Sequence, residues 1–377
     1  MKKVAVCLEH RFFIYKGNLY TKLSFPYFYW KDYLTYFNKV TIIARAQPIE
    51  TLEVGMQQVN GFNIEFEPLP YYIGLKQFFW KFPLLFIALF KISLKYKYFL
   101  LRSGNSSNIL FFFLMLMGKP YLREYPGNIK EGVIGFAGNS LKIRILANIL
   151  DSLAKFQAKF SKANSFVSNY CLDLYASKKP SFVFSSFKAS EIKTEVKKDS
   201  YLLKDKLNIV SVGRLEGEKG HLGFLEALKD VPYVSLHIVG DGTQKLFLEN
   251  YAATHNIDIV FYGSITDRER LFSILKKADV FIIPSLTEGM PRALLEAMAV
   301  GLPCLGTCVG GIPEVLDSDS LYAPDDLELL KNKLLEIYKS QALREKMGLR
   351  NREFINRFYS DEALESRKHQ FWSKLYE

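Results

Sequence analysis

The segment Val280–Val300 reads VFIIPSLTEGMPRALLEAMAV, in which a short polar loop joins an apolar run to a helical pattern. The run Val280–Ile283 predicts a buried strand, and Arg292–Val300 predicts a helix. Pro291 suits the first turn of that helix, because its missing N–H would be unpaired there in any case. The free N–H groups at such a helix start form a site for an anion. Since proline supplies no donor, the donors are expected from Gly289, Met290 and Arg292.

Two acids lie in the same segment, Glu288 just before the helix and Glu296 about two turns further on. This spacing allows the two carboxylates to contact different parts of one extended ligand. Gly289, beside the first acid, allows close approach of the backbone. The segment therefore predicts a binding site for an extended, anionic ligand at the start of one helix.

Strands alternate with helices on both sides of this segment, which predicts parallel sheets covered by helices. In the second half, further strands are expected at Asn208–Val212, Ser235–Val239, Ile259–Tyr262 and Pro303–Gly306. In the first half, strands are expected at Lys3–Leu8, Val40–Ala44, Phe99–Arg102, Pro120–Arg123, Ser165–Ser168 and Phe182–Phe184. The main helices are expected at Phe28–Phe37, Gln77–Lys95, Leu141–Ser161, Gly220–Leu228 and Arg268–Lys277. We predict an α/β chain of two Rossmann-like, doubly wound domains that face a cleft, where such sheets bind ligands.

The segment around Glu288 and Glu296 resembles the E-x7-E signature of retaining glycosyltransferases of family 4, which have the GT-B fold. The specificity lies in its frame, in which Pro-Ser and Glu-Gly follow an apolar strand and LLEAMAVGLP follows the loop. The resemblance implies that Glu288 contacts the sugar of a nucleotide-sugar donor and that Glu296 binds the ribose hydroxyls, since carboxylates accept well from hydroxyl groups. It also implies retention of the anomeric configuration.

A second segment, Val212–Gly220, reads VGRLEGEKG and resembles the VGRL…KG turn of the same family. The resemblance implies that Arg214 and Lys219 contact the donor diphosphate, where two cations can offset the charge on a departing group. The catalytic residues implied are Glu288, Arg214 and Lys219. The donor-binding residues expected are Glu296, Gly213, Gly289, Met290, Arg292, Gly240, Tyr262 and Gly17.

The first half of the chain departs from the family pattern. Many relatives have a glycine pair after the first strand, whereas only Gly17 is near that strand here. His10 lies just past the strand, and Glu124 ends another strand where a catalytic group can project; a plain surface role stays open for such residues. The acceptor-side candidates are His10, Arg102, Arg123, Glu124 and Asn128.

The composition of the chain and the resemblance together predict the domain organisation. Residues 1–187 would form the acceptor-side domain and 207–358 the nucleotide-sugar-binding domain, joined by the polar, lysine-rich linker 188–206. Residues 359–377 would form a C-terminal helix that crosses back to the first domain, where the aromatic residues around Trp372 can dock.

The formal net charge of +11 is unevenly distributed, because Pro68–Arg123 contains no acidic residue and has aromatic residues interleaved with its cations. Such a surface favours an anionic membrane or a nucleic acid; a core helix with a solvated basic face is the alternative. No nucleic-acid-binding motif is present, so we expect no nucleic-acid partner.

The N-terminus MKKVAVCLEH lacks the features of a signal peptide. The apolar stretches Phe82–Phe90 and Ile109–Met117 are shorter than the roughly 20 residues that span a bilayer.

We therefore expect a cytoplasmic enzyme, peripheral at the inner face of the plasma membrane. It would transfer a sugar from a nucleotide-diphosphate sugar to a lipid-linked glycan in bacterial capsule, O-antigen or exopolysaccharide synthesis. We expect no cofactor and no metal, since cations would stabilise the leaving group and Asp317-Ser318-Asp319 lies in a turn-like context. Two alternatives stay open: a sugar-nucleotide epimerase of similar shape, and a basic nucleic-acid-binding protein.

Overall fold

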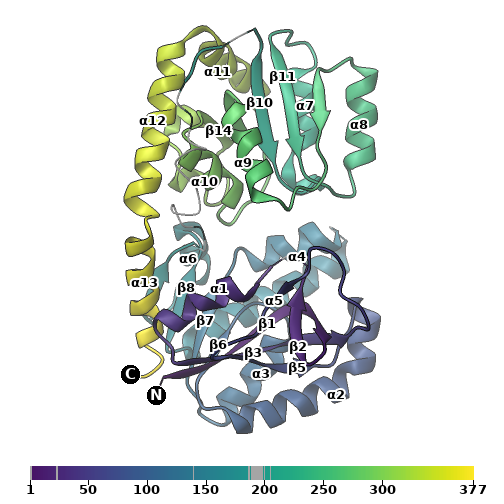
Figure 1. Cartoon of the computed structure of the whole chain (residues 1–377), viewed down its shortest axis with the longest axis vertical. Coiled ribbons are helices and arrows are strands. Elements are labelled where there is room, and N and C mark those ends of the chain that lie inside the picture. Colours follow the sequence, from purple (N-terminus) through teal and green to yellow (C-terminus); the bar gives the residue numbers. More distant parts are fainter. Residues whose placement is uncertain are drawn as a thin grey trace.

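The computed structural model describes residues 2–22, 24–138, 140–185, 187, 198, 200–203 and 205–377. It has two lobes, each built on a sheet of mainly parallel strands with helices on its faces (Figure 1). The predicted α/β class with two such sheets is confirmed. Most of the predicted linker 188–206 lies outside the described residues.

The N-terminal sheet has a long first strand at its centre. Its strands are β1 (Lys3–Tyr15), β2 (Asn18–Thr21), β3 (Lys39–Pro48), β4 (Gln57–Gln58), β5 (Ile64–Leu69), β6 (Phe99–Leu101), β7 (Tyr121–Tyr125), β8 (Ala163–Phe166) and β9 (Ser181–Val183). The parallel strands lie in the order β5-β3-β1-β6-β7-β8-β9, so the chain first builds outward on one side of β1 and then on the other. This reversal makes a switch point between β1 and β6, where doubly wound sheets bind ligands.

Helices cover both faces of this sheet. They are α1 (Tyr27–Lys31), α2 (Gly74–Lys95), α3 (Asn105–Leu116), α4 (Ile129–Ala137), α5 (Leu141–Phe160) and α6 (Asn169–Tyr175), with a 3-10 turn at Tyr33–Thr35. Alternate residues of β1 face opposite cores, because successive side chains of a strand point to opposite faces. Ala5 and Cys7 pack with α2 and α3, whereas Val4 and Val6 pack with α1 and the C-terminal residues of the chain.

The helix α2 differs from the prediction. It begins at Gly74, three residues before the predicted start, and extends through Pro83 to Lys95, so by length and composition it would suffice to cross a membrane. Leu85, Leu89 and Ile92 are nevertheless buried in the N-terminal core. The helix therefore lies on the lobe and leaves a largely exposed apolar surface.

The C-terminal sheet has the strand order β12-β11-β10-β13-β14-β15, with all its pairs parallel. Its strands are β10 (Leu207–Val212), β11 (Val234–Val239), β12 (Ile259–Phe261), β13 (Val280–Ile283), β14 (Cys304–Thr307) and β15 (Leu321–Tyr322). Its helices are α7 (His221–Leu228), α8 (Lys245–Thr254), α9 (Arg268–Lys277), α10 (Arg292–Val300) and α11 (Leu327–Lys339), and short 3-10 turns lie at Gly217–Lys219, Ile312–Glu314 and Ser318–Ser320. The switch point of this sheet lies between β10 and β13.

The last two helices connect the lobes along one side of the molecule (Figure 1). Helix α12 (Gln341–Phe358) packs on the C-terminal lobe, where Ile355 is fully buried. Helix α13 (Asp361–Ser373) then reaches the N-terminal lobe. Its Trp372 is buried there, with ring centroids 5.0 Å from Tyr33 and 5.4 Å from Phe37.

Candidate active site

A pair of opposite charges lies at the switch point of the C-terminal sheet, where β10 and β13 are neighbours. The loop after β10 carries Lys219 and the loop after β13 carries Glu288, and Lys219 Nζ lies 2.5 Å from Glu288 Oε1. The two side chains are only 17% and 12% exposed. Ser285 donates a hydrogen bond of 2.9 Å to the same carboxylate oxygen. The fold thus brings together two of the three predicted catalytic residues.

Close backbone packing holds the two loops together. Gly220 has a φ of +67°, and a Cβ on it would lie 2.0 Å from the carbonyl oxygen of Pro284. Only glycine fits such a position without strain. The N–H of Leu286 also donates to the carbonyl oxygen of Glu218 at 2.8 Å. The position of Lys219 is therefore set by the loop that carries Glu288.

Arg214 lies in the same loop as Lys219 but does not join the ion pair. Its guanidinium binds Glu218 at 2.8 Å and is 63% exposed. The sequence placed both cations on one diphosphate, whereas the structure places Lys219 against an acid and Arg214 nearer to solvent. A ligand can reach Arg214 without displacing a buried contact.

Glu296 lies in the second turn of α10 and is 5% exposed. Arg268 and Arg292 each approach its Oε1 at 3.2 Å. Arg292 was predicted as a backbone donor, but its side chain is also bonded to Glu296, four residues further along the helix. Arg268 begins α9 and was not predicted, because its place beside Glu296 depends on how α9 and α10 pack.

Of the other predicted donor residues, Gly213, Gly240, Tyr262 and Met290 lie in the C-terminal lobe. Gly213 follows β10, and its carbonyl oxygen is packed against Gly240 at the end of β11. Tyr262 follows β12 and bonds through its hydroxyl to His237 Nδ1 at 3.0 Å. Burial lowers the pKa of His237, so this imidazole is neutral at pH 7. The side chain of Met290 packs on the C-terminal core.

The two lobes contact each other beside Glu288. Gly289 lies against Gly127, which follows β7, since a Cβ on Gly289 would be 3.2 Å from the Cα of Gly127. Thr287 donates a hydrogen bond to Glu131 at the start of α4. Glu314 accepts from the backbone N–H groups of Asn169 and Tyr170 at 2.8 and 2.7 Å. The carboxyl ends of both sheets therefore face the same interlobe region. None of these contacts was predicted, because each joins segments that are far apart in the sequence.

Arg102 and Glu124 form a partly buried ion pair at the carboxyl ends of β6 and β7 in the N-terminal lobe. Arg102 follows β6, and its Nε lies 3.3 Å from Glu124 Oε2 on β7, with side chains 19% and 14% exposed. Arg102 also donates to the Tyr29 hydroxyl at 2.5 Å, and Tyr33 lies 3.5 Å from Glu124. Burial raises the pKa of both tyrosines, so they remain neutral donors.

Three other candidates have structural partners. Arg123 is 1% exposed and donates to Gln157 and to the carbonyl oxygen of Leu101, which corrects its prediction as an acceptor residue. The cause is strand alternation, since Arg123 and Glu124 face opposite sides of the sheet. Asn128 caps α4 through the N–H of Glu131. Gly17 lies in the turn between β1 and β2 at a φ of +78°. This turn conformation alone explains the glycine, with no contact to the nucleotide sugar.

His10 lies on β1, where its Nε2 is 3.1 Å from the Thr21 hydroxyl. Burial, followed by the nearby Arg11, Arg45 and Arg102, lowers the pKa of His10 to about 4. The imidazole is therefore neutral at pH 7 and lies in a positive potential.

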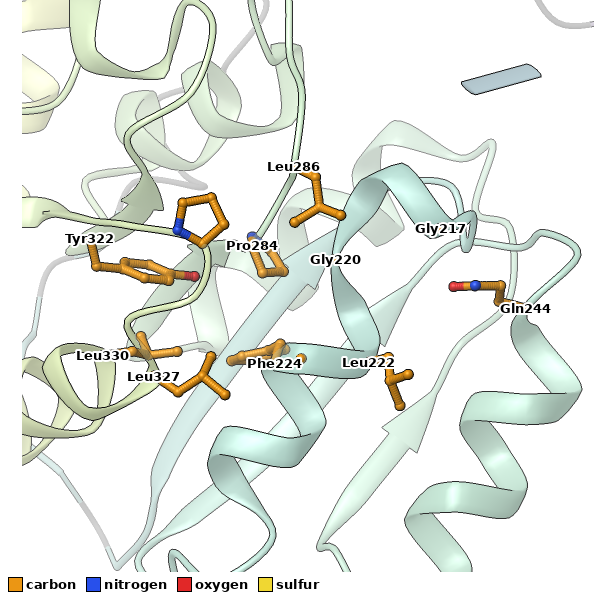
Figure 2. Close-up of a pocket in the computed structure, with 12 residues that line it drawn as sticks. Gly217, Gly220, Leu222, Phe224, Gln244, Pro284, Leu286, Tyr322, Leu327 and Leu330 are labelled. Carbon is orange, nitrogen blue, oxygen red and sulfur yellow. The ribbon is translucent and has the colours of Figure 1, made fainter. Parts of the chain in front are cut away.

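Behind the Lys219 loop lies a separate apolar pocket of about 290 Å³ (Figure 2). Figure 2 shows Leu222, Phe224, Leu327 and Leu330 around it, with Tyr322 at one side. Neither Lys219 nor Glu288 lines it. Its apolar lining does not suit a diphosphate, so we place the candidate site at the ion pair and not in this pocket.

Among the described residues, no group of three or more His, Cys, Asp or Glu side chains could hold a metal ion. In the Asp317-Ser318-Asp319 sequence, Asp317 is bonded to Arg350.

Comparison with known families and proteins gives a consistent result. Residues 192–354 match the family described as "Glycosyl transferases group 1". Protein CapJ of Staphylococcus aureus is 28% identical, and the match covers 91% of this chain and 88% of CapJ.

Of two further proteins, one resembles part of this chain in sequence and the other shares its fold. The Escherichia coli UDP-Gal:alpha-D-GlcNAc-diphosphoundecaprenol alpha-1,3-galactosyltransferase is 40% identical over 26% of this chain and 27% of its own length. The crystal structure of Anabaena HepE in complex with UDP superposes with a TM-score of 0.70 at 13% identity, covering 99% of this chain and all of HepE. At that identity the likeness concerns the fold alone.

Proposed function

This chain belongs to the group 1 glycosyltransferases of the GT-B fold. On that premise we propose that it transfers the sugar of a nucleotide-diphosphate sugar to a lipid-linked glycan. The observation that carries the proposal is the ion pair of Lys219 and Glu288 at the switch point of the C-terminal sheet. HepE, which shares the fold, holds UDP, and this supports a nucleotide donor for the present chain.

The geometry suggests how the donor would be used. Its diphosphate would lie at the start of α10, where Lys219 and the exposed Arg214 face it. The bond between the anomeric carbon and the diphosphate oxygen breaks, and its electron pair stays on the leaving diphosphate. The acceptor hydroxyl oxygen forms the new bond to the anomeric carbon, and its proton passes to the released nucleoside diphosphate. Cations that face a developing charge lower the barrier, so we propose that no metal is needed.

A thermal-shift screen with nucleotide sugars tests the donor side. A ligand that binds only the folded state adds RT ln(1 + [L]/Kd) to the free energy of unfolding and so raises the melting temperature. We expect one nucleotide sugar to raise it in the native chain and to lose most of that effect in Glu296→Ala. The matched control is Glu345→Ala at an exposed position. The proposal fails if no nucleotide sugar or nucleoside diphosphate stabilises the native chain.

The acceptor side is supported by an exposed apolar face on the N-terminal lobe. Helix α3 contacts both α2 and α5, through Phe113 against Phe86 and Phe111 against Phe156. We define the apolar face by the exposed side chains Phe79, Trp80, Leu84, Ile87 and Leu94 of α2, Phe112 and Leu116 of α3, and Leu141, Ile145 and Ile149 of α5. Exposed apolar side chains that gather on one face of a protein mark a surface for a partner or a membrane.

Cations lie beside the apolar face, including Lys76, Lys81 and Lys91 on α2, which are exposed. An apolar surface bordered by cations suits an anionic bilayer. We propose that the chain rests on the cytoplasmic leaflet and works on a glycan carried there. The name of the galactosyltransferase relative places its acceptor on a lipid diphosphate, which supports a lipid-linked acceptor.

Sedimentation with vesicles tests this part. The native chain should sediment with vesicles containing phosphatidylglycerol at low salt and much less with neutral vesicles. The triple variant Lys76→Glu/Lys81→Glu/Lys91→Glu should stay in solution. The matched triple variant Lys229→Glu/Lys331→Glu/Lys346→Glu, on the C-terminal lobe, should still sediment. Equal sedimentation of both variants would refute the proposed membrane contact and would leave the proposed donor chemistry untouched.

A further inference from the structure

A second, larger pocket lies at the switch point of the N-terminal sheet. Its volume is about 1030 Å³, and it is lined by residues of β1, by Arg45 of β3, by the segment after β5 and by Asn105 after β6. Since β1 pairs with β6 only up to Cys7, the lining residues Glu9, His10, Arg11 and Phe13 lie beyond the carboxyl end of that pairing. This is the crevice where doubly wound sheets bind ligands.

The lining is positively charged. It carries the three cations Arg11, Lys22 and Arg45 against the one carboxylate of Glu9. That carboxylate is already occupied, since it accepts from the Tyr72 hydroxyl and from the N–H of Ser106 and pairs with Arg45 at 3.0 Å. Lys22 pairs with Glu53, outside the lining. Arg11 is exposed and makes no ion pair with any residue that the structure describes.

Arg45 supplies the most specific observation. The residue is only 8% exposed, and its Nε has no hydrogen-bond partner among the described residues. Its Nη1 donates to the carbonyl oxygen of Tyr72 at 2.6 Å. Buried N–H donors are nearly always paired in folded proteins. A guanidinium that is held in place at the wall of a pocket suits a phosphate or carboxylate.

Two helices begin at the same pocket. Gly74 is the first residue of α2 and Asn105 is the first residue of α3, and both line it. Helix N-termini carry a partial positive charge and bind anions. The lowered pKa of His10, which the nearby arginines favour, agrees with a positive potential in this region.

The wall of the pocket also has an apolar side. Ile73 and Leu75, at the start of α2, line it and are exposed. The apolar face begins one turn further along the same helix with Phe79. The pocket therefore joins a cationic floor to an apolar surface.

We infer that this pocket binds the phosphate or diphosphate group of the acceptor, with Arg11 and Arg45 as its ligands and α2 beside the group attached to that phosphate. The inference rests on the proposed function, because it names the acceptor end of the same reaction. β1 lies two strands from β7, and Gly127, two residues after the end of β7, contacts the C-terminal lobe. Two strand spacings are about 10 Å, which leaves room for a sugar residue between the phosphate and the donor.

The experiment measures inorganic pyrophosphate binding by titration calorimetry. It uses the full chain with Arg214→Ala and Lys219→Ala, so that the donor loop cannot account for the signal. We expect binding in this background and a loss of at least tenfold when Arg11→Gln or Arg45→Gln is added. Lys31→Gln, at an exposed position on α1, is the matched control and should change nothing. Because Arg45 is buried, Arg11→Gln keeps the test valid should the other variant fail to fold.

Two probes identify the source of the phosphate. Geranyl diphosphate should bind more tightly than pyrophosphate if the ligand is a lipid headgroup, and Leu75→Ser should remove the gain. Glucose 1-phosphate should bind as well as geranyl diphosphate if the ligand is a free sugar phosphate. Either result supports a phosphate site.

Absence of pyrophosphate binding, or equal binding in Arg11→Gln, Arg45→Gln and the control, would overturn the inference. The donor thermal shift is measured separately in the Arg11→Gln chain. If no nucleotide sugar raises the melting temperature of the native chain, the proposed donor is refuted. The pyrophosphate titration reports on this pocket alone.

Discussion

At the scale of single residues, the pair of Lys219 and Glu288 is the part of the site that substitution can test most directly. Lys219→Met keeps the length of the side chain and removes its charge. We expect kcat to fall by about 10²-fold, the usual effect of removing one group that stabilises a leaving charge. Measured rates of nucleotide release with acceptor present give this value. Lys229→Met, in an exposed position near the end of α7, should keep the native rate.

A double-mutant cycle measures how much the ion pair of Lys219 and Glu288 contributes to the free energy of unfolding. Glu288→Gln leaves Lys219 without its partner at a site that is 17% exposed. The unfolding free energy should fall by about 1–3 kcal/mol, less than for a fully buried pair. The double variant Lys219→Met/Glu288→Gln should recover part of that loss. Additive losses in urea unfolding would show that the two charges do not interact.

His221 gives a prediction on pH. The ring is 3% exposed, neither nitrogen has a partner among the described residues, and burial lowers its pKa to about 4. The unfolded chain therefore binds a proton between pH 6.5 and 4 that the folded chain does not. Stability conferred by the neutral ring is lost as the pH falls through this window. Between pH 7 and 5 the native chain should lose about 2 kcal/mol more than His221→Phe, as urea unfolding at both values measures. Parallel losses in the two chains would contradict the burial of an uncharged ring.

At the scale of elements, the turn after β11 tests whether backbone packing sets the donor site. Gly240 has a φ of +151°, and a Cβ there would lie 1.8 Å from the carbonyl oxygen of Gly213. Gly240→Ala should cost at least about 2 kcal/mol, from strain and overlap, and should abolish the donor-induced thermal shift. Gly223→Ala, inside α7 with open space at its Cβ, should instead be neutral or stabilising by up to about 1 kcal/mol. An unchanged donor shift in Gly240→Ala would show that the turn is not part of the site.

The strands β10, β11 and β13 of the C-terminal half could be predicted well, because they are mostly buried apolar runs directly followed by glycine or proline. The loops after β10 and β13 could therefore be placed at one sheet edge before the fold was known. The N-terminal half could not be predicted as fully. β2 and β4 are short antiparallel additions, and β1 continues to Tyr15 beyond the polar residues after Leu8. That longer strand places Arg11 in a pocket.

Side-chain direction was harder to predict than element position. Arg123 and Glu124 are neighbours at the end of β7, and only their relation to the sheet faces decides which one is buried. Glu296 was found from its spacing, whereas its partner Arg268 depends on the packing of α9 against α10. Residues joined by the backbone could be inferred, and residues joined only by packing could not.

At the scale of the whole molecule, Glu131 links the lobes next to the candidate site. It accepts from Thr287, the residue before Glu288, and from the Tyr170 hydroxyl at 3.0 Å. Glu131→Gln weakens both bonds, because a neutral oxygen accepts less strongly than a carboxylate. The donor residues lie in the C-terminal lobe, so the donor-induced thermal shift should stay unchanged. Transfer needs both lobes in place, so kcat with acceptor should fall by about tenfold, the effect of roughly 1.4 kcal/mol. Glu345→Gln, at an exposed position of α12, controls for the loss of one charge. A loss of donor binding in Glu131→Gln would mean that the lobes assemble the donor site jointly, whereas full activity would mean that this contact does not limit the transfer step.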